Sequence, residues 1–380
     1  MRKWMPWCGA ALLVATGACL DIPSSNSASG YVVFAAIGDS GSGTSTQQEV
    51  ADALATVCTS ENCDFAIVLG DNFYDCGVSP VDSAGNYDPQ FDSKFNDVYA
   101  ALDIPFYVVP GNHDYWTVDA TGACDMGEAF DDERAWAQVA YSLSNYPATT
   151  NFVLPWLPTY ELTHPSGWLD LFPLDTQRIL WGKDDSGNDG ASSMLWDKLA
   201  TDISSSTANY KIAFGHHAYL SNGMHANVGV YNDITPGASD ICDPVTRTPA
   251  TTTAREAGAC LEDYLNENVC GKVDLYIAGH DHNLQFLPSV AACGDTEFIV
   301  SGSAGKTRPI TGSNPAYFEQ EAAGFAVLKI CGTLGRLDAL TFYDSTGAQL
   351  YQYTTSETTA CPMVEKLVPI EHRAYEGSKR

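Results

Sequence analysis

The sequence is poor in basic residues. Its 380 residues include 19 Lys and Arg against 47 Asp and Glu, which gives a formal net charge of −28 at pH 7. Proteins that bind nucleic acid neutralise phosphates with Lys and Arg, so this deficit argues against a nucleic-acid partner. It also means that an anionic substrate must be attracted by local positive charge, which bound metal ions can supply.

Two other patterns are missing. No Cys-x-x-Cys pair occurs among the 12 cysteines, which disfavours a zinc ribbon. No internal repeat or firm domain boundary is visible, and we expect one folded domain over residues 31–355 followed by an extension, residues 356–380. Hydrophobic residues make up 45% of the chain, enough for a sizeable core, so global disorder is disfavoured.

The N-terminus is typical of an export signal. A basic start at residues 1–3 precedes a short apolar run that ends in small residues near position 18, so residues 1–19 read as a signal peptide rather than a spanning helix. The Thr-Gly-Ala-Cys stretch at 16–19 resembles a bacterial lipobox, with Cys19 lipidated, and plain secretion is the alternative. Residues 20–30 are rich in Ser, Asn and Ala and read as a flexible tether. We therefore expect a periplasmic, outer-membrane or secreted protein.

The cysteine count agrees with export. Cys8 lies inside the signal and Cys19 at its end, and removing both leaves ten, an even number that suits disulfides in an exported chain. A free thiol at Cys19 would make the count odd, which favours lipidation. Cys58 and Cys63 bracket a short loop and form the pair that we predict.

Apolar runs alternate with helical patterns along the chain, which predicts an α/β fold with layered sheets and helices. The last third, from about residue 297, is strand-like with Gly-rich turns, whereas residues 115–163 and 222–254 read as long loops, the first of them lying over the site. We expect strands over residues 31–37, 65–69, 104–109, 168–174, 210–214 and 273–278, and helices from about 46, over 91–102, 128–139, 193–203 and 257–265.

Metal-type side chains follow many of these strands. Each has an ordinary explanation alone, since Asp and Asn are common in turns and His or Tyr can be packed in a core. Together they are notable, because the carboxyl ends of strands gather at one face of a sheet, where α/β folds bind ligands. The set is Asp39, Asp71, Tyr74, Asn112, His113, His216, His280 and His282.

The number of donors predicts two metal ions. His280 and His282 are two residues apart after a buried strand, so an extended backbone sends both imidazoles to the same side. Imidazole is the usual nitrogen ligand of zinc, iron and copper. The carboxylates, phenolate, amide oxygen and imidazoles amount to about twice the three or four protein ligands that one metal needs.

The motifs resemble those of the calcineurin-like metallophosphoesterases and, within them, the purple acid phosphatases. Tyr74 distinguishes the purple acid phosphatases from most of the superfamily, and residues 279–285 are similar to the small, tartrate-resistant enzymes. The resemblance implies a four-layer αββα sandwich with two mixed sheets flanked by helices. It rests on Gly38-Asp39-Ser40-Gly41, Gly70-Asp71-Asn72-Phe73-Tyr74, Gly111-Asn112-His113-Asp114, Gly215-His216 and Gly279-His280-Asp281-His282.

The resemblance also implies a ligand set. Asp39, Tyr74 and His282 would hold a ferric ion, and Asp71 would bridge it to a second ion of divalent iron, zinc or manganese. Asn112, His216 and His280 would hold that second ion. His217 follows His216 where the small enzymes commonly have tyrosine, so His217 is an alternative ligand.

The implied activity is that of an exported acid phosphatase, in which a metal-bound hydroxide attacks phosphorus. Asp71, Asn112, His113 and His225 would then form the catalytic and substrate-binding set, with His113 and His225 near the phosphate and the leaving group. A phosphodiesterase or nucleotide-sugar hydrolase with the same metals is an alternative, and a non-catalytic metal-binding surface lipoprotein is another. We expect a monomer whose partner is a small phosphate ester, touching a membrane only through a lipid at Cys19.

Overall fold

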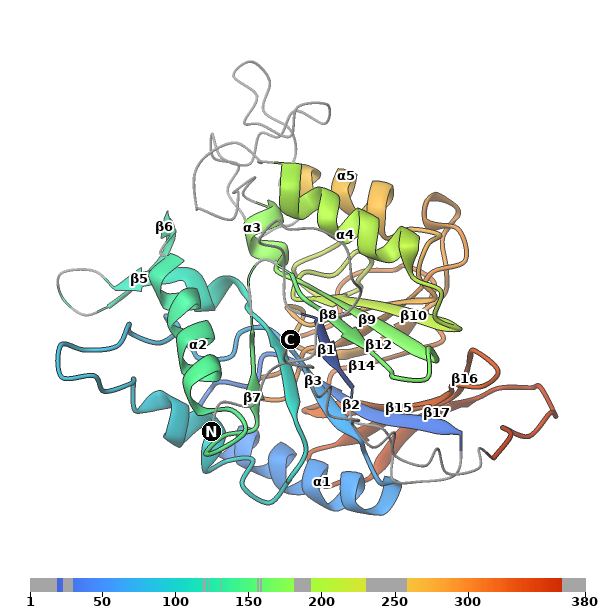
Figure 1. Ribbon diagram of the computed structural model, residues 1–380, viewed down its shortest axis with the longest axis horizontal. Coiled ribbons are helices and arrows are strands. Elements are labelled where there is room, and N and C mark those ends of the chain that lie inside the picture. Colours follow the sequence, from blue (N-terminus) through green and yellow to red (C-terminus); the bar gives the residue numbers. More distant parts are fainter. Residues whose placement is uncertain are drawn as a thin grey trace, which may run out of the picture.

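A computed structural model describes residues 19–22, 30–118, 121, 123–130, 132–155, 157, 159–180, 193–229 and 258–363. Within these residues, two large mixed sheets lie against each other, with helices on their outer faces (Figure 1). This confirms the layered α/β sandwich expected from the sequence.

The seven-stranded sheet contains the first half of the site. Its central strands β2, β3 and β4 pair in parallel, so their carboxyl ends point the same way. Helix α1 (Ser45–Glu61) packs on its outer face through Val50, Leu54 and Val57. The strand order is β17 (Gln349–Thr354), β16 (Arg336–Asp344), β15 (Gly324–Cys331), β2 (Tyr31–Ile37), β3 (Phe65–Leu69), β4 (Phe106–Val109) and β7 (Phe152–Val153).

The eight-stranded sheet contains the second half. Strands β9, β10, β11 and β13 pair in parallel. Helices α3 (Thr176–Leu180), α4 (Ser193–Ser205) and α5 (Ala259–Asn268) cover its outer face (Figure 1). The strand order is β1 (Cys19–Asp21), β8 (Glu161–Thr163), β9 (Leu169–Leu174), β10 (Tyr210–Gly215), β11 (Leu275–Ala278), β13 (Glu297–Ser301), β12 (Leu284–Leu287) and β14 (Phe318–Gln320).

Strand β11 shows how the layers are built. Leu275 and Ile277 join the core between the two sheets, whereas Tyr276 and Ala278 pack in the core under the outer helices. Successive side chains of a strand point to opposite faces, so a wholly apolar strand fits a sheet that is buried on both sides.

Two predicted helices differ from the structure. Residues 91–102 contain only a π-helical turn, Asp92–Asn96, followed by turns, because Phe95 packs against Phe106 and Phe152 and this tertiary packing overrides the helical spacing. The helix expected over 128–139 is α2 (Asp132–Asn145), which starts later because strand β6 (Cys124–Phe130) occupies the preceding residues and pairs with β5 (Trp116–Val118). The described residues between 115 and 163 therefore contain four short strands, β5 to β8, besides the one helix that we expected among loops.

The first residues of the tether expected over 20–30 are not a flexible segment. Leu20 and Asp21 belong to β1, which pairs in parallel with β8, and Ile22 is buried in the core. Residues 1–18 and 23–29 lie outside the described part of the chain, as does most of the surface loop expected over 222–254. Of the helices that the structure describes, none has the length and apolarity needed to span a membrane.

Four disulfides join described residues. The predicted pair Cys58–Cys63 is confirmed, and Cys331–Cys361 ties the start of the expected C-terminal extension to β15. Disulfides form and persist in oxidising compartments, so they point to an extracellular or secreted protein. The other two pairs are Cys76–Cys124 and Cys270–Cys293.

Candidate metal centre

Five strand ends build the site. Strands β2, β3 and β4 of one sheet and β10 and β11 of the other each end one to three residues before a predicted ligand. Asp39, Asp71 and His280 have left-handed backbones, with φ of 56°, 52° and 67°. This conformation is uncommon outside glycine and turns the chain sharply, which aims each side chain across the strand ends.

The glycines before these residues leave room for the donors. A Cβ at Gly70, whose φ is 89°, would lie 2.6 Å from Nδ1 of His216, and one at Gly279 would lie 2.7 Å from Oδ2 of Asp39. Contacts below 3.0 Å are not tolerated by real Cβ atoms. The glycines of the motifs therefore allow the backbone of one strand end to approach the side chains of another.

The first donor group is rich in oxygen. Tyr74 Oη donates to Asp39 Oδ1 at 2.9 Å and lies 3.3 Å from His282 Nε2. His282 Nε2 is itself 3.2 Å from Asp39 Oδ1. Ligand atoms of Asp39, Asp71 and His282 lie within 4.8 Å of one another, and all three residues are buried.

The second donor group is rich in nitrogen. His216 Nε2 lies 2.9 Å from Asn112 Oδ1, 3.1 Å from His280 Nδ1 and 3.5 Å from Asp71 Oδ1. His216 Nδ1 lies 2.8 Å from the carbonyl oxygen of Leu69, which can only accept, so Nδ1 carries the hydrogen. In the neutral ring Nε2 is then a lone pair directed at oxygen acceptors, an arrangement that a cation would satisfy.

Asp71 lies between the two groups, and the charges around it reflect this. Burial raises the pKa of the Asp71 carboxyl, but His216 and His113 outweigh that effect and hold the pKa below its ordinary value. Burial lowers the pKa of His216, yet the carboxylates of Asp71 and Asp39 raise it overall. Burial, reinforced by Asp39 and Asp71, raises the pKa of Tyr74 well above its ordinary value, so a cation must displace the proton for phenolate to form.

His113 lies at the rim of the site. Its backbone N–H donates to Asp71 Oδ1 at 3.0 Å, and its Nδ1 lies 2.6 Å from the carbonyl oxygen of Asp75. That carbonyl fixes the hydrogen on Nδ1 and leaves Nε2 on the side of the site, 3.8 Å from Asp71 Oδ2. Burial, with a smaller contribution from Lys306, lowers the pKa of His113. Trp116 packs against its ring at 3.8 Å.

His225 joins the site from a different loop. Its ring stacks on His280 with centroids 4.2 Å apart and lies 6.0 Å from the ring of His282. Asp281, between the two histidines of the central motif, accepts hydrogen bonds from the His225 backbone N–H at 2.9 Å and from the Ser221 hydroxyl. The structure thus brings all the predicted site residues together.

His217 also lies in the nitrogen-rich group. Ligand atoms of His216, His217 and His280 lie within 4.8 Å of one another. The sequence reasoning missed its neighbour Thr176, whose hydroxyl accepts from the backbone N–H groups of His216 and His217 and contacts His217 Nδ1 at 2.8 Å. Its position after β9, a strand that ends at the same edge, was the available signal.

Asp114, like Thr176, supports the site in a way that the sequence did not predict. Its carboxylate accepts from the backbone N–H groups of Gly111 and Asn72 and from Gln138 Nε2. Burial, with a contribution from Asp71, raises its pKa to about 7. These bonds join the turns that carry Asp71 and Asn112.

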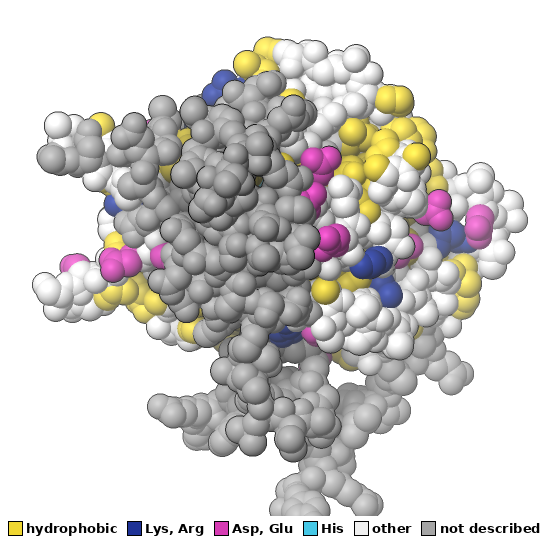
Figure 2. All heavy atoms as spheres, turned by 90° about the horizontal axis from the view of Figure 1, so that it is seen from above, with side chains coloured by type: hydrophobic (Ala, Val, Ile, Leu, Met, Phe, Trp, Pro, Cys, Tyr) yellow, Lys and Arg dark blue, Asp and Glu magenta, His cyan; other side chains and the backbone are white. Residues whose placement is uncertain are grey.

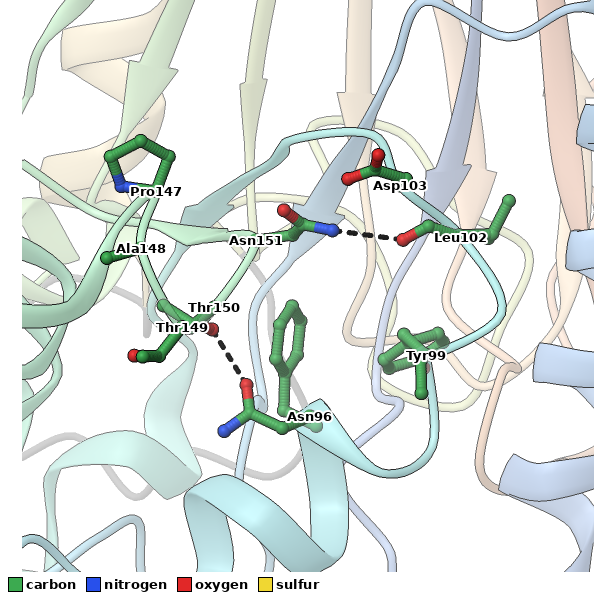
Figure 3. A pocket seen from close by; sticks show the side chains of 11 residues that line it. Asn96, Tyr99, Leu102, Asp103, Pro147, Ala148, Thr149, Thr150 and Asn151 are labelled. Carbon is green, nitrogen blue, oxygen red and sulfur yellow. Dashed lines mark hydrogen bonds between the residues drawn. The ribbon is translucent and has the colours of Figure 1, made fainter.

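A groove of about 420 Å³ lies elsewhere in the molecule (Figure 3). In its wall, Thr150 Oγ1 donates to Asn96 Oδ1 at 2.7 Å and Asn151 Nδ2 to the Leu102 carbonyl at 2.9 Å. These residues precede β4 and β7, so the groove lies at the amino ends of these strands, whereas the site lies at the carboxyl end of β4.

The model of the calcineurin-like phosphoesterase family matches residues 32–284. The chain belongs to this family. Among its curated relatives, purple acid phosphatase 7 of Arabidopsis thaliana is 30% identical over 293 residues, covering 75% of this phosphoesterase and 73% of the relative. The type 5 tartrate-resistant acid phosphatase of Mus musculus is 25% identical, covering 71% of each chain.

Solved structures agree on the fold. A purple acid phosphatase from yellow lupin seeds covers 85% of this phosphoesterase and 53% of its own chain, with 14% identity and a TM-score of 0.53. The inner-membrane-complex anchor GAP50 of Plasmodium covers 85% and 88%, with 21% identity and a TM-score of 0.57. At these identities the structures support the fold alone, whereas the curated relatives identify an acid phosphatase-type hydrolase of phosphate esters.

Proposed function

We propose that this phosphoesterase is an exported phosphomonoesterase with two metal ions. The observation that carries the proposal is that Asp71 lies between an oxygen-rich and a nitrogen-rich donor group, both buried and both at the carboxyl ends of strands. Metals in two-metal sites are roughly 3.5–4 Å apart, a span that one carboxylate bridges.

The donor chemistry fits a different metal in each group. Asp39, Tyr74, His282 and Asp71 would hold a ferric ion, because phenolate and carboxylate are hard ligands. Asn112, His216, His280 and Asp71 would hold divalent iron, zinc or manganese, with imidazole as the main ligand. We place His216 in this set ahead of His217, because Nε2 of His216 lies near both Asn112 and Asp71, whereas Nδ1 of His217 contacts Thr176.

The protein's own groups would handle the leaving group. When bound, the two cations supply Lewis acidity and an activated water for in-line attack on phosphorus. His113 holds Nδ1–H toward the Asp75 carbonyl, which leaves Nε2 to carry a proton to the departing oxygen. Asn112, within the second donor group, and His225, whose ring stacks on His280, would contact the phosphoryl oxygens.

The test is turnover of p-nitrophenyl phosphate and bis(p-nitrophenyl) phosphate by metal-loaded protein. We expect the monoester to be hydrolysed at acidic pH and the diester at least tenfold more slowly. A preference for the diester would instead indicate a phosphodiesterase. No turnover of either ester at full metal occupancy would indicate a binding protein without catalysis.

His113→Asn separates leaving-group protonation from metal binding. We expect unchanged metal content with a loss of activity that is largest for esters of poorly acidic alcohols, since general acid catalysis contributes about 10²–10⁴-fold. His164→Asn is the control, because His164 is a buried histidine that packs on Trp168 after β8.

Export and a small partner complete the proposal. The described disulfides support an oxidising compartment, and the site suits a small phosphate ester acted on by a monomer. The described surface in Figure 2 shows acidic and basic side chains scattered among uncharged ones, in keeping with a partner other than nucleic acid. The compartment would be the periplasm, the outer membrane or the exterior.

The lipidation state of Cys19 distinguishes a lipid-anchored protein from a freely secreted one. Labelling with a fatty-acid analogue, together with the mass of the mature N-terminus, distinguishes them. With lipidation, Cys19→Ala would release the protein into the soluble fraction; with plain secretion, the variant would be processed and distributed as the wild type.

A further inference from the structure

Lys306 lies beside the metal centre, although neither the sequence motifs nor the ligand set includes it. Its ammonium is 3.4 Å from the centre of the Tyr74 ring, and 3.8 Å from Asp75 Oδ1. The side chain of Lys306 is 34% exposed and that of Asp75 71% exposed. Lys306 is therefore a cation at the rim, with one face toward the site and one toward solvent.

The backbone around Lys306 is fixed to the site. Ala304 N–H donates to the Gly38 carbonyl at 3.1 Å, and Thr44 Oγ1 lies 3.5 Å from the Gly305 carbonyl. Two residues further on, Arg308 N–H donates to the His282 carbonyl at 2.8 Å. The segment that carries both cations is thus bonded to two of the turns that present metal ligands, and the Arg308 side chain is exposed.

The position of Lys306 separates it from the inner phosphate site. Tyr74 directs its hydroxyl toward Asp39 and His282, while Lys306 lies over the ring face. Asp75 lies 3.8 Å from the Lys306 ammonium through its carboxylate and contacts His113 Nδ1 through its carbonyl oxygen, so Lys306 lies on the rim that a leaving group would pass. In a chain of net charge −28, a cation here attracts anions that the surrounding protein repels.

We propose that Lys306, assisted by Arg308, determines specificity for phosphate monoesters whose leaving group carries a second anionic group, such as a carboxylate or another phosphate. The inference rests on the proposed phosphomonoesterase function and names its substrate class. The second anion replaces Asp75, whose 3.8 Å separation from the ammonium and high exposure make it a weak partner.

The competing role for Lys306 is to adjust Tyr74 through the cation–π contact. That role affects every substrate equally, whereas recognition of a second anion affects only substrates that have one. Three esters separate the two roles: phenyl phosphate, 3-carboxyphenyl phosphate and its neutral analogue 3-carbamoylphenyl phosphate. The quantity to compare is the ratio of kcat/KM for the carboxylate ester to that for the carbamoyl ester.

We expect the wild-type ratio to exceed one and to fall about three- to fivefold in Lys306→Met, the effect of one partly exposed charge pair. The double variant with Arg308→Gln should bring the ratio to about one, and added salt should lower it in the wild type. Lys329→Met is the matched control, because Lys329 lies 4.5 Å from the Tyr31 ring in a similar contact on β15. It should leave the ratio unchanged.

Binding of non-hydrolysed analogues gives a readout independent of turnover. Calorimetry with phenylphosphonate and 3-phosphonobenzoic acid should show tighter binding of the latter, lost in Lys306→Met. An unchanged ratio and unchanged binding preference in Lys306→Met would overturn the proposal, as would an equal fall for all three esters. Absence of turnover with the binding preference intact would overturn the phosphomonoesterase function and leave the anion site standing.

Discussion

The two sheets supply different chemistry to one site. The seven-stranded sheet contributes the carboxylates, phenol and amide of Asp39, Asp71, Tyr74 and Asn112, whereas the eight-stranded sheet contributes only imidazoles as ligand candidates. Oxygen donors thus come from the first third of the chain and nitrogen donors mostly from the last two thirds. Each donor group nevertheless draws on both sheets, because His282 joins the oxygen-rich group and Asn112 joins the nitrogen-rich one, so the site exists only where the two sheets meet.

The largest expected effect comes from replacing Asp71, the carboxylate between the two donor groups. Asp71→Asn should reduce kcat/KM more than about a hundredfold, beyond the range for residues that only support ligands, and should lower the metal content of both positions. Metal analysis with phosphatase assay checks this. Asp82→Asn, at an exposed loop carboxylate, is the control. Near-normal turnover in Asp71→Asn would rule out the bridging role.

The nitrogen-rich donor group contains two adjacent histidines, and variants of each show which one binds a metal. His216→Ala should lose one metal and more than about a hundredfold in kcat/KM, because a ligand is removed. His217→Ala should retain both metals and lose about ten- to a hundredfold, as for a residue that supports ligands. The reverse order would assign the ligand role to His217.

The oxygen-rich donor group can be tested by its colour. Oxidised protein should show a broad visible absorption band from phenolate bound to ferric iron, and Tyr74→Phe should abolish it while lowering activity by about tenfold. Absorption spectra with iron analysis check this. A colourless protein filled with zinc would contradict the ferric assignment and leave hydrolysis of phosphate esters intact.

The smallest expected effect concerns the pH dependence of stability, and it comes from one half-buried acid in or next to each sheet. Burial raises the pKa of Glu161 on β8 to about 7 and that of Asp64 next to β3 to about 6. Both groups favour the folded state most at low pH, and this contribution is lost as pH rises through the folded pKa. We expect thermal stability to fall between about pH 4 and 7 from these groups.

Two variants show how much of this loss of thermal stability comes from the acid of each sheet. Glu161→Gln should flatten the decline up to pH 7, and Asp64→Asn the part up to about pH 6, as measured by melting temperature across pH. Asp97→Asn, at another exposed carboxylate, is the control. A rise in stability over the same range that depends on Glu161 or Asp64 would contradict the sign.

Much of this could be predicted from the sequence because the information is local. A short apolar run, a glycine and a polar residue identify a strand end, and five such ends identified the candidate ligands without a contact map. Lys306 and Arg308 carry no such local signal for their roles. Their positions depend on which loop packs against which turn, such as Gly305 against Asp39, and that information is spread over distant parts of the chain.

The helix expected over residues 91–102 failed for a related reason. Its spacing of aromatic residues is helical, but Phe95 packs against Phe106 on β4 and Phe152 on β7. Propensity and period describe a segment in isolation, and tertiary packing decides in such cases.

The left-handed backbones of Asp39, Asp71 and His280 set a trade-off for anyone who engineers this phosphoesterase. Each non-glycine residue held in that region costs about 1–3 kcal/mol. A library screened only for heat resistance will therefore enrich glycine at these three positions and yield proteins that are stable but inactive. Selection must therefore include turnover in every round, because at these three positions the residue that favours stability differs from the residue that supports activity.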